Sequence, residues 1–343
     1  MNRPVRRYII NAACVWLPLG YLSRKSPFRL ILPFWHCVAE ETPPHIRHLY
    51  PASTPRTFRH DLEVLVKNYR PVSAQEVLLH VTEEKILSKP SMLLSFDDGL
   101  TEAARIIEPI LSGMGIPAVF FVNSAFIDNQ DMFYRFKVSL LIDRLKTMKS
   151  PEGIFEIISG RHPVAISSKH QLHRFLMNLS YQDMGKINSI AELFDLDFTA
   201  YLKIRKPFMS TSQLEGLIEK GFEVGAHSID HPRYASIPAD EQVRQTRESL
   251  DWLRRNFKIN TACFAFPFTD SGVSESFFKE IFSDHPGNPD LTFGTAGMKD
   301  DTWPRHLQRI HAGSTSMGIK GLIRSEYLLY NLKRLSGTSY VKR

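Results

Sequence analysis

Two short groups of carboxylates and imidazoles stand out in the sequence. Asp97-Asp98-Gly99 directly follows the apolar run SMLLSF, and His227-Ser228-Ile229-Asp230-His231 directly follows FEVGA. Two adjacent carboxylates cannot both be buried and ionised cheaply, so a cation that binds one of them relieves the conflict and leaves the other as a base. The alternative is a simple strand-to-helix turn in which Asp98 caps the following helix.

The two histidines of the second group, His227 and His231, are four residues apart. On a helical turn this spacing places both imidazoles on one side, where they can share a metal ion. With one carboxylate they supply three protein ligands and leave positions open for water and substrate, which is typical of a catalytic metal site. Nitrogen and oxygen ligands favour zinc, with iron, cobalt, nickel and manganese as alternatives. Because the chain has 13 histidines, two unrelated loop histidines are the competing interpretation.

Alternating strands and helices must bring these groups together. Such alternation predicts a parallel sheet, either open or closed into a barrel, whose strands present their carboxyl ends on the active face. Both groups follow predicted strands directly. The apolar runs predict strands at 30–38, 91–96, 116–122, 222–227, 262–268, 291–295 and 307–311. The periodic segments predict helices at 57–68, 101–114, 211–220, 239–257, 274–282 and 318–335.

Residues 132–207 interrupt this alternation. They contain helical patterns at 134–149 and 169–180 and little strand character, so we expect a mainly helical insertion over one face of the domain. The predicted organisation is an N-terminal basic and apolar segment at 1–25, followed by a catalytic domain at 26–335 that contains the insertion.

The motifs SFDDG and HSIDH, in this order, resemble the first two motifs of the polysaccharide deacetylases, the NodB-homology family of carbohydrate esterase family 4. The resemblance runs from ILPFWH to the QRI around Arg309 and omits the insertion. It implies a distorted (β/α)7-type barrel and a metal-dependent hydrolase that removes N-acetyl groups from amino sugars of a polysaccharide or glycolipid. It also implies that Asp97 is the general base and that Asp98, His227 and His231 hold a divalent metal.

The third motif departs from the family pattern. It usually reads Arg-x-Pro-Tyr, forms a groove wall and orients the base, whereas this chain has Ala265-Phe266-Pro267-Phe268. We expect Pro267 and Phe268 still to form the substrate-binding wall. Arg309, near another predicted strand end, is the expected replacement for the missing charge, and an ordinary surface arginine is the alternative.

The general acid is the second departure. Many family members place it in a C-terminal strand of the type I-x-L-x-H, but some poly-N-acetylglucosamine deacetylases resemble a circular permutation that carries this strand first. The segment ILPFWH, which ends at His36, is similar to such a strand moved to the N-terminus. The resemblance therefore predicts His36 as the general acid and His311 as the reserve candidate. A histidine that is only hydrogen-bonded within the structure is the alternative.

Charge and the N-terminal segment bear on partners and location. The net charge of +7 attracts phosphates, anionic lipids or acidic glycans, but the basic residues are scattered and no nucleic-acid partner is expected. Three arginines precede an uncharged stretch at 8–22, which favours peripheral membrane contact by a retained segment, with secretion as the alternative. Three cysteines without motif spacing fit a reducing compartment, so the expected location is the cytoplasm.

Three other functions compete with deacetylation of an N-acetylated glycan. One is a deformylase or other C–N hydrolase that acts on a lipid-linked amino sugar. Another is a non-catalytic glycan-binding module, against which the intact Asp–Asp and His–His set counts. The last is a membrane-surface or nucleic-acid-binding protein that depends on charge alone, for which salt-dependent binding without metal dependence is the signature.

Overall fold

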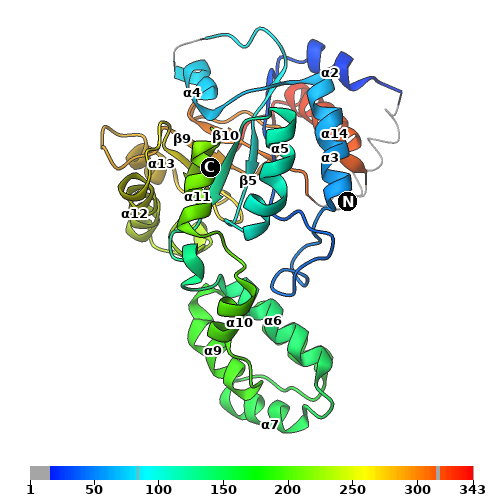
Figure 1. Ribbon diagram of the computed structural model, residues 1–343, viewed down its shortest axis with the longest axis vertical. Helices are drawn as coiled ribbons and strands as arrows, with labels where there is room; N and C mark the ends of the chain where they lie inside the picture. The colour runs from blue at the N-terminus through cyan, green and yellow to red at the C-terminus, as the bar shows by residue number, and fades with distance from the viewer. Residues whose placement is uncertain (1–15, 83–84, 314–316, 343) are drawn as a thin grey trace.

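A curved parallel β-sheet forms the centre of the molecule (Figure 1). The computed structural model describes residues 16–82, 85–313 and 317–342. Within them, the main sheet has the strand order β10-β9-β8-β7-β6-β5-β2-β11, and each strand runs parallel to its neighbours. A smaller sheet with the order β1-β4-β3 extends it.

The two ends of the main sheet meet at Arg309. This residue separates β10 (His306–Gln308) from β11 (Ile310–His311), yet β10 pairs with β9 and β11 pairs with β2 at the opposite end of the strand order. The sheet is therefore a nearly closed barrel, and the predicted distorted barrel is confirmed. The other strands are β1 (Leu30–Ile31), β2 (Pro33–Trp35), β3 (Arg70–Pro71), β4 (Ser91–Met92), β5 (Leu94–Phe96), β6 (Ala118–Val122), β7 (Glu223–Ala226), β8 (Cys263–Ala265) and β9 (Leu291–Gly294).

The strands are buried on both sides, as their continuous apolar runs predict. All five residues of β6 are buried, and they alternate between two apolar clusters. Phe120 packs in the cluster shared with the outer helices, whereas Phe121 packs in a second cluster with Phe293 and Leu291. The interior of the barrel and the layer between barrel and helices therefore form separate parts of the core.

Amphipathic helices cover the outside of the barrel. In α3 (Pro55–Asn68), the Thr54 side chain caps the first turn, and Phe58, Leu62 and Leu65 form one buried stripe. The other covering helices are α2 (Leu19–Lys25), α4 (Ala74–Thr82), α5 (Glu108–Met114), which continues a π-helical turn at Ala103–Ile107, α11 (Thr211–Glu219), α12 (Ala239–Asn256), α13 (Glu275–Ile281) and α14 (Gly318–Leu335).

A helical lobe projects from one end of the barrel (Figure 1). It has its own apolar cluster, which includes Leu141, Ile158 and Leu176, so it folds around a core separate from that of the barrel. The lobe occupies most of the range 132–207, where we expected a helical insertion. Its helices are α6 (Tyr134–Thr147), α7 (Glu152–Arg161), α8 (Lys169–Asn178), α9 (Met184–Leu193) and α10 (Phe198–Arg205).

The N-terminal segment is described only in part. Residues 1–15 lie outside the described residues, so the predicted segment 1–25 is represented by α2, which packs against α14. The Arg324 side chain of α14 donates a hydrogen bond to the Leu17 carbonyl. In the part of the chain that is described, every helix is too short or too polar to cross a bilayer.

A left-handed turn ends β5 and directs the chain into the next helix. Asp98 and Gly99 have φ angles of 72° and 62°, a region that L-residues rarely adopt. A Cβ atom added at Gly99 would lie 3.2 Å from Val122 Cγ1 on the neighbouring strand β6. Both the backbone conformation and the limited space therefore favour glycine at this position.

We predict that Gly99→Ala lowers the free energy of unfolding by about 1–3 kcal/mol, because a side chain at this φ is strained and meets β6. Urea unfolding measures the change. Gly113→Ala in α5 is the matched control, since nothing lies within 4 Å of its added Cβ, and it should raise stability by roughly 0.5–1 kcal/mol. Equal stabilities of the Gly99 variant and the native protein would contradict the argument.

Candidate active site

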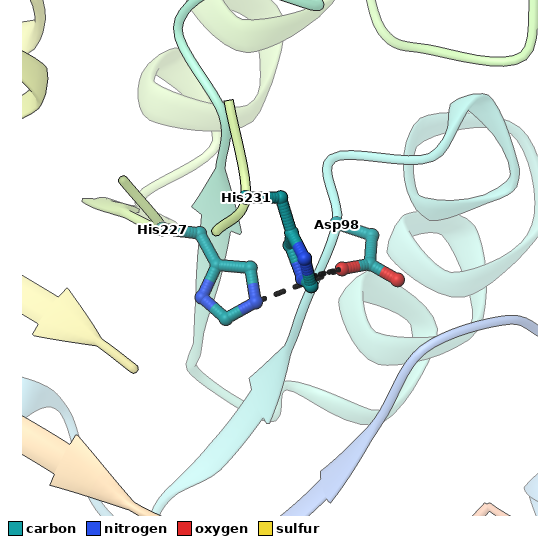
Figure 2. Close-up of side chains that lie close together, drawn as sticks. All are labelled: Asp98, His227 and His231. Carbon is teal, nitrogen blue, oxygen red and sulfur yellow. Dashed lines mark ion pairs between the residues drawn. The ribbon is translucent and has the colours of Figure 1, made fainter. Parts of the chain in front are cut away.

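The two chemical groups identified in the sequence meet at the carboxyl ends of β5 and β7. Asp98 Oδ1 lies 3.2 Å from His231 Nε2 and 3.6 Å from His227 Nε2. The three side chains point toward one another (Figure 2), and all three are buried. One ligand atom from each residue lies within 4.8 Å of the others, a spacing at which the three atoms can share one cation.

The loop that carries the histidines is not the helical turn that their spacing suggested. Residues 227–231 have no helical assignment, and Ser228 and His231 adopt left-handed φ angles of 69° and 64°. The Ser228 hydroxyl accepts a hydrogen bond from the His231 backbone N–H at 3.0 Å, and Asn123 donates to the His227 carbonyl. The two imidazoles therefore converge because the loop folds back on itself, and the prediction of a helical turn was wrong.

Buried polar atoms make this group suitable for a divalent cation. Asp98 Oδ1 is buried and receives no hydrogen bond from the described residues, while the Tyr50 hydroxyl donates to Oδ2 at 3.1 Å. His227 Nδ1 donates to the Ala265 carbonyl at 2.8 Å, which leaves Nε2 as the electron-pair donor facing Asp98. Burial lowers the pKa of His227 to about 4, so its imidazole is neutral at physiological pH, as metal binding requires.

The second carboxylate of the pair has a different partner. Arg309 Nη1 lies 2.6 Å from Asp97 Oδ1, and Nη2 lies 2.8 Å from Oδ2, which is a bidentate ion pair. Arg309 is fully buried, donates to the Ser95 hydroxyl at 3.1 Å and lies 4.2 Å from the centre of the Phe34 ring. Burial alone would raise the pKa of Asp97, but the Arg309 charge outweighs it and holds the pKa below its usual range. Asp97 is therefore ionised at neutral pH.

A pocket of about 520 Å³ opens over these groups, a size suited to a small ligand. His36 and Phe268 line it, as does His311. Phe268 adopts a left-handed φ of 57°, and its ring centre lies 4.9 Å from that of His231. Pro267 is buried and lies outside the pocket lining, so the predicted wall consists of Phe268 together with Phe266. The other lining residues are Phe34, Leu49, Tyr50, Asp97, Asp98, Phe133, Arg135, Met177, His227, His231 and Thr295.

The helical lobe also contacts the histidine loop. The Phe133 ring lies 4.0 Å from the His231 ring between centres, and the Tyr181 hydroxyl donates to Asp230 Oδ2 at 2.6 Å. Gln245 of α12 donates to the other oxygen of Asp230 at 2.8 Å. Phe133 and Tyr181 could not be identified from the sequence, because no local pattern shows that the insertion folds back over the site. For the buried charge of Arg309, the one available signal was Ser95, a polar residue within an apolar strand.

A second group of possible ligands lies elsewhere in the described residues, at Asp270, Asp301 and His306. Here hydrogen bonds already satisfy the side chains. Gln308 Nε2 lies 2.9 Å from Asp270 Oδ2 and 3.0 Å from Asp301 Oδ2, and His306 Nδ1 lies 2.7 Å from the Thr292 hydroxyl. This group therefore holds strand ends together without needing an ion, in contrast to Asp98.

Comparison with known proteins agrees with this fold and identifies the family. The polysaccharide deacetylase family model matches residues 84–275, more than half of the chain. The structure is similar to that of IcaB from Ammonifex degensii, with a TM-score of 0.55, 15% identity and coverage of 88% of this chain and 98% of that chain. It is also similar to the Streptococcus pyogenes deacetylase PplD in complex with acetate, with a TM-score of 0.53 and 14% identity. That match covers 88% of this chain and 99% of PplD. At these identities the likeness shows the fold. No curated protein matches the sequence significantly.

A parallel barrel with a buried aspartate pair and two converging histidines at its strand ends defines a hydrolase of the deacetylase type. The chain belongs to the polysaccharide deacetylase family, which confirms the resemblance seen in its motifs. Membership makes it a hydrolase that acts on the amide bonds of N-acetylated sugars. The individual roles of Asp97, His36 and Arg309 remain predictions.

We predict that Arg309→Met destabilises the protein by about 3–5 kcal/mol, because it leaves the buried Asp97 carboxylate without a counter-ion. Adding Asp97→Asn should recover much of this loss in urea unfolding, since the unpaired charge is then removed. Arg244→Met is the control: this exposed arginine pairs with Glu241 on the same helix, and its loss should cost less than about 1 kcal/mol. Equal losses for Arg309→Met and Arg244→Met would contradict the buried-pair argument.

Proposed function

We propose that this protein removes acetyl groups from the amino-sugar nitrogens of a glycan by using one divalent metal ion, with zinc as the first candidate. Asp98, His227 and His231 would hold the ion. The observation that carries the proposal is a buried carboxylate oxygen that faces two imidazole nitrogens and receives no hydrogen bond from the described residues. A divalent cation at that position balances the buried charge and uses all three electron-pair donors.

Asp97 is the proposed general base. A bound divalent ion supplies Lewis acidity, which lowers the pKa of water and polarises the acyl carbonyl. Asp97 takes the proton of the attacking water, which requires an ionised carboxylate in a fixed orientation. The bidentate contact with Arg309 supports both requirements, since it lowers the pKa of Asp97 and fixes its side chain.

His36 is the proposed general acid for the departing amine. Without a proton the amine would leave as an anion, so a donor near the scissile nitrogen is needed. His36 lines the pocket, and its Nδ1 atom is buried without a hydrogen-bond partner in the described residues. The ring centre of His36 lies 4.9 Å from that of Tyr50, whose hydroxyl donates to Asp98 Oδ2, and this supports a position beside the reacting groups. His311, which also lines the pocket, is the alternative donor.

The pocket wall supports a sugar as the substrate. Phe268 is 40% exposed, so its ring can pack against the apolar face of a pyranose while the acetamido group reaches the metal site. The proposed substrate is an N-acetylated glycan. A lipid-linked N-acetylated sugar is the alternative, because its sugar group offers the same acetamido chemistry.

Separate substitutions should distinguish metal ligands from the base. Asp98→Ala and His231→Ala should lose metal and activity together, whereas Asp97→Asn should keep the metal and lose turnover by roughly 10²–10⁴-fold. Metal content by mass spectrometry and acetate release from chitin oligomers and poly-N-acetylglucosamine measure the two properties. His170→Ala, an exposed histidine on α8, is the control and should change neither.

Two results would count against this scheme. Full turnover by Asp97→Asn would remove Asp97 as the base. A protein that is replete with metal yet inert on every acylated amine would instead favour a glycan-binding module.

A further inference from the structure

Arg135 brings a positive charge from the helical lobe into the active-site pocket. It lies in the first turn of α6 and lines the same pocket as Asp97, Asp98 and the histidines. Its Nη1 atom donates to the Met177 carbonyl of α8 at 2.7 Å, and its guanidinium carbon lies 5.3 Å from the centre of the Tyr134 ring. These contacts hold the guanidinium in place and leave its other N–H groups available to a ligand.

No acidic side chain neutralises the charge of Arg135 in the part of the chain that the structure describes. No carboxylate of the described residues lies within ion-pair distance of it, whereas Lys137, two residues later on the same helix, pairs with Asp131 at 2.8 Å. The two carboxylates of the pocket lining have their own partners: Asp97 pairs with Arg309, and Asp98 faces the two imidazoles. The pocket therefore keeps one unmatched arginine, and a bound divalent ion would make it more positive.

The surroundings of Arg135 strengthen its attraction for an anion. Leu49, Phe133 and Met177 line the same pocket, and Arg135 is itself half-buried. Apolar neighbours lower the local dielectric, so a charge pair is stronger here than on an open surface. A planar guanidinium with free N–H groups matches the oxygens of a phosphate or a carboxylate.

We propose that the substrate carries an anionic group, a phosphate or a carboxylate, in addition to the N-acetylated sugar, and that Arg135 binds it. This inference rests on the proposed function for the reacting sugar. Arg135 is then a specificity-determining residue that the insertion supplies. A neutral homopolymer of N-acetylglucosamine would leave the guanidinium without a counter-charge.

The test compares three N-acetylglucosamine oligomers of equal length on the zinc-loaded, full-length protein: the neutral oligomer, the same oligomer with a terminal phosphate, and one that contains a uronic acid. The native protein should show the lower KM on an anionic oligomer. Arg135→Gln should raise that KM roughly tenfold with little change in kcat, because the contact serves binding and not the chemical step. The KM for the neutral oligomer should stay unchanged.

Two further variants separate ligand binding from packing. Arg135→Lys should give an intermediate KM, since it keeps the charge but loses the planar fork. Arg174→Gln, an exposed arginine on α8, should behave like the native protein. The preference of the native protein should weaken at high salt. Comparison of KM for the phosphorylated and the uronic-acid-containing oligomers identifies which anion the site binds. The same measurement on a lipid pyrophosphate-linked sugar in detergent tests whether the phosphate belongs to a lipid carrier.

Equal rises in KM on neutral and anionic oligomers would overturn the inference, because Arg135 would then act only by holding α6 to α8. A native protein that deacetylates the neutral oligomer without any preference for the anionic ones would also overturn it and leave the proposed function intact. Calorimetric binding of the same oligomers to Asp97→Asn protein, with and without Arg135→Gln, tests the contact without turnover. A tenfold loss of affinity restricted to anionic oligomers supports the inference even if the proposed reaction fails.

Discussion

Two carboxylates buried side by side at the end of β5 set the main constraint on this structure. Asp97 and Asp98 are each less than 5% exposed, so each needs its own compensating charge. The structure supplies the guanidinium of Arg309 for Asp97, and for Asp98 it supplies two imidazoles that can hold a cation beside the carboxylate. The left-handed turn at Asp98-Gly99 separates the two carboxylates, so that adjacent residues enter different environments.

The arginine that pairs with Asp97 also stands at the closure of the barrel. Arg309 lies between β10 and β11, where the sheet ends meet, and its backbone N–H donates to the Gly294 carbonyl of β9 at 3.1 Å. In the third motif, where the family usually has arginine, this chain has Ala265, whose carbonyl accepts the His227 ring N–H. Arg309 remains the proposed replacement for the family's arginine, and closure of the sheet between β10 and β11 is what brings it to Asp97.

The elements could be predicted from the sequence better than the contacts between them. The apolar runs that precede Asp97 and His227 predicted two strands. They also predicted that both residues lie on the active face, because the carboxyl ends of parallel strands share one edge of the sheet. The shape of the histidine loop could not be predicted, since Ser228 and His231 take left-handed conformations, which are uncommon for residues other than glycine. Phe133, like Tyr181, reaches the site only because the lobe folds back, which depends on tertiary packing and leaves no local pattern.

The most direct test of the central claim is anomalous scattering from a crystal grown with Zn²⁺. The account predicts a single strong peak about 2.0–2.2 Å from Asp98 Oδ1, His227 Nε2 and His231 Nε2, with Asp97 still paired to Arg309. An ion bound instead at Asp270, Asp301 and His306, or an empty site at Asp98 in protein that retains zinc, would contradict it.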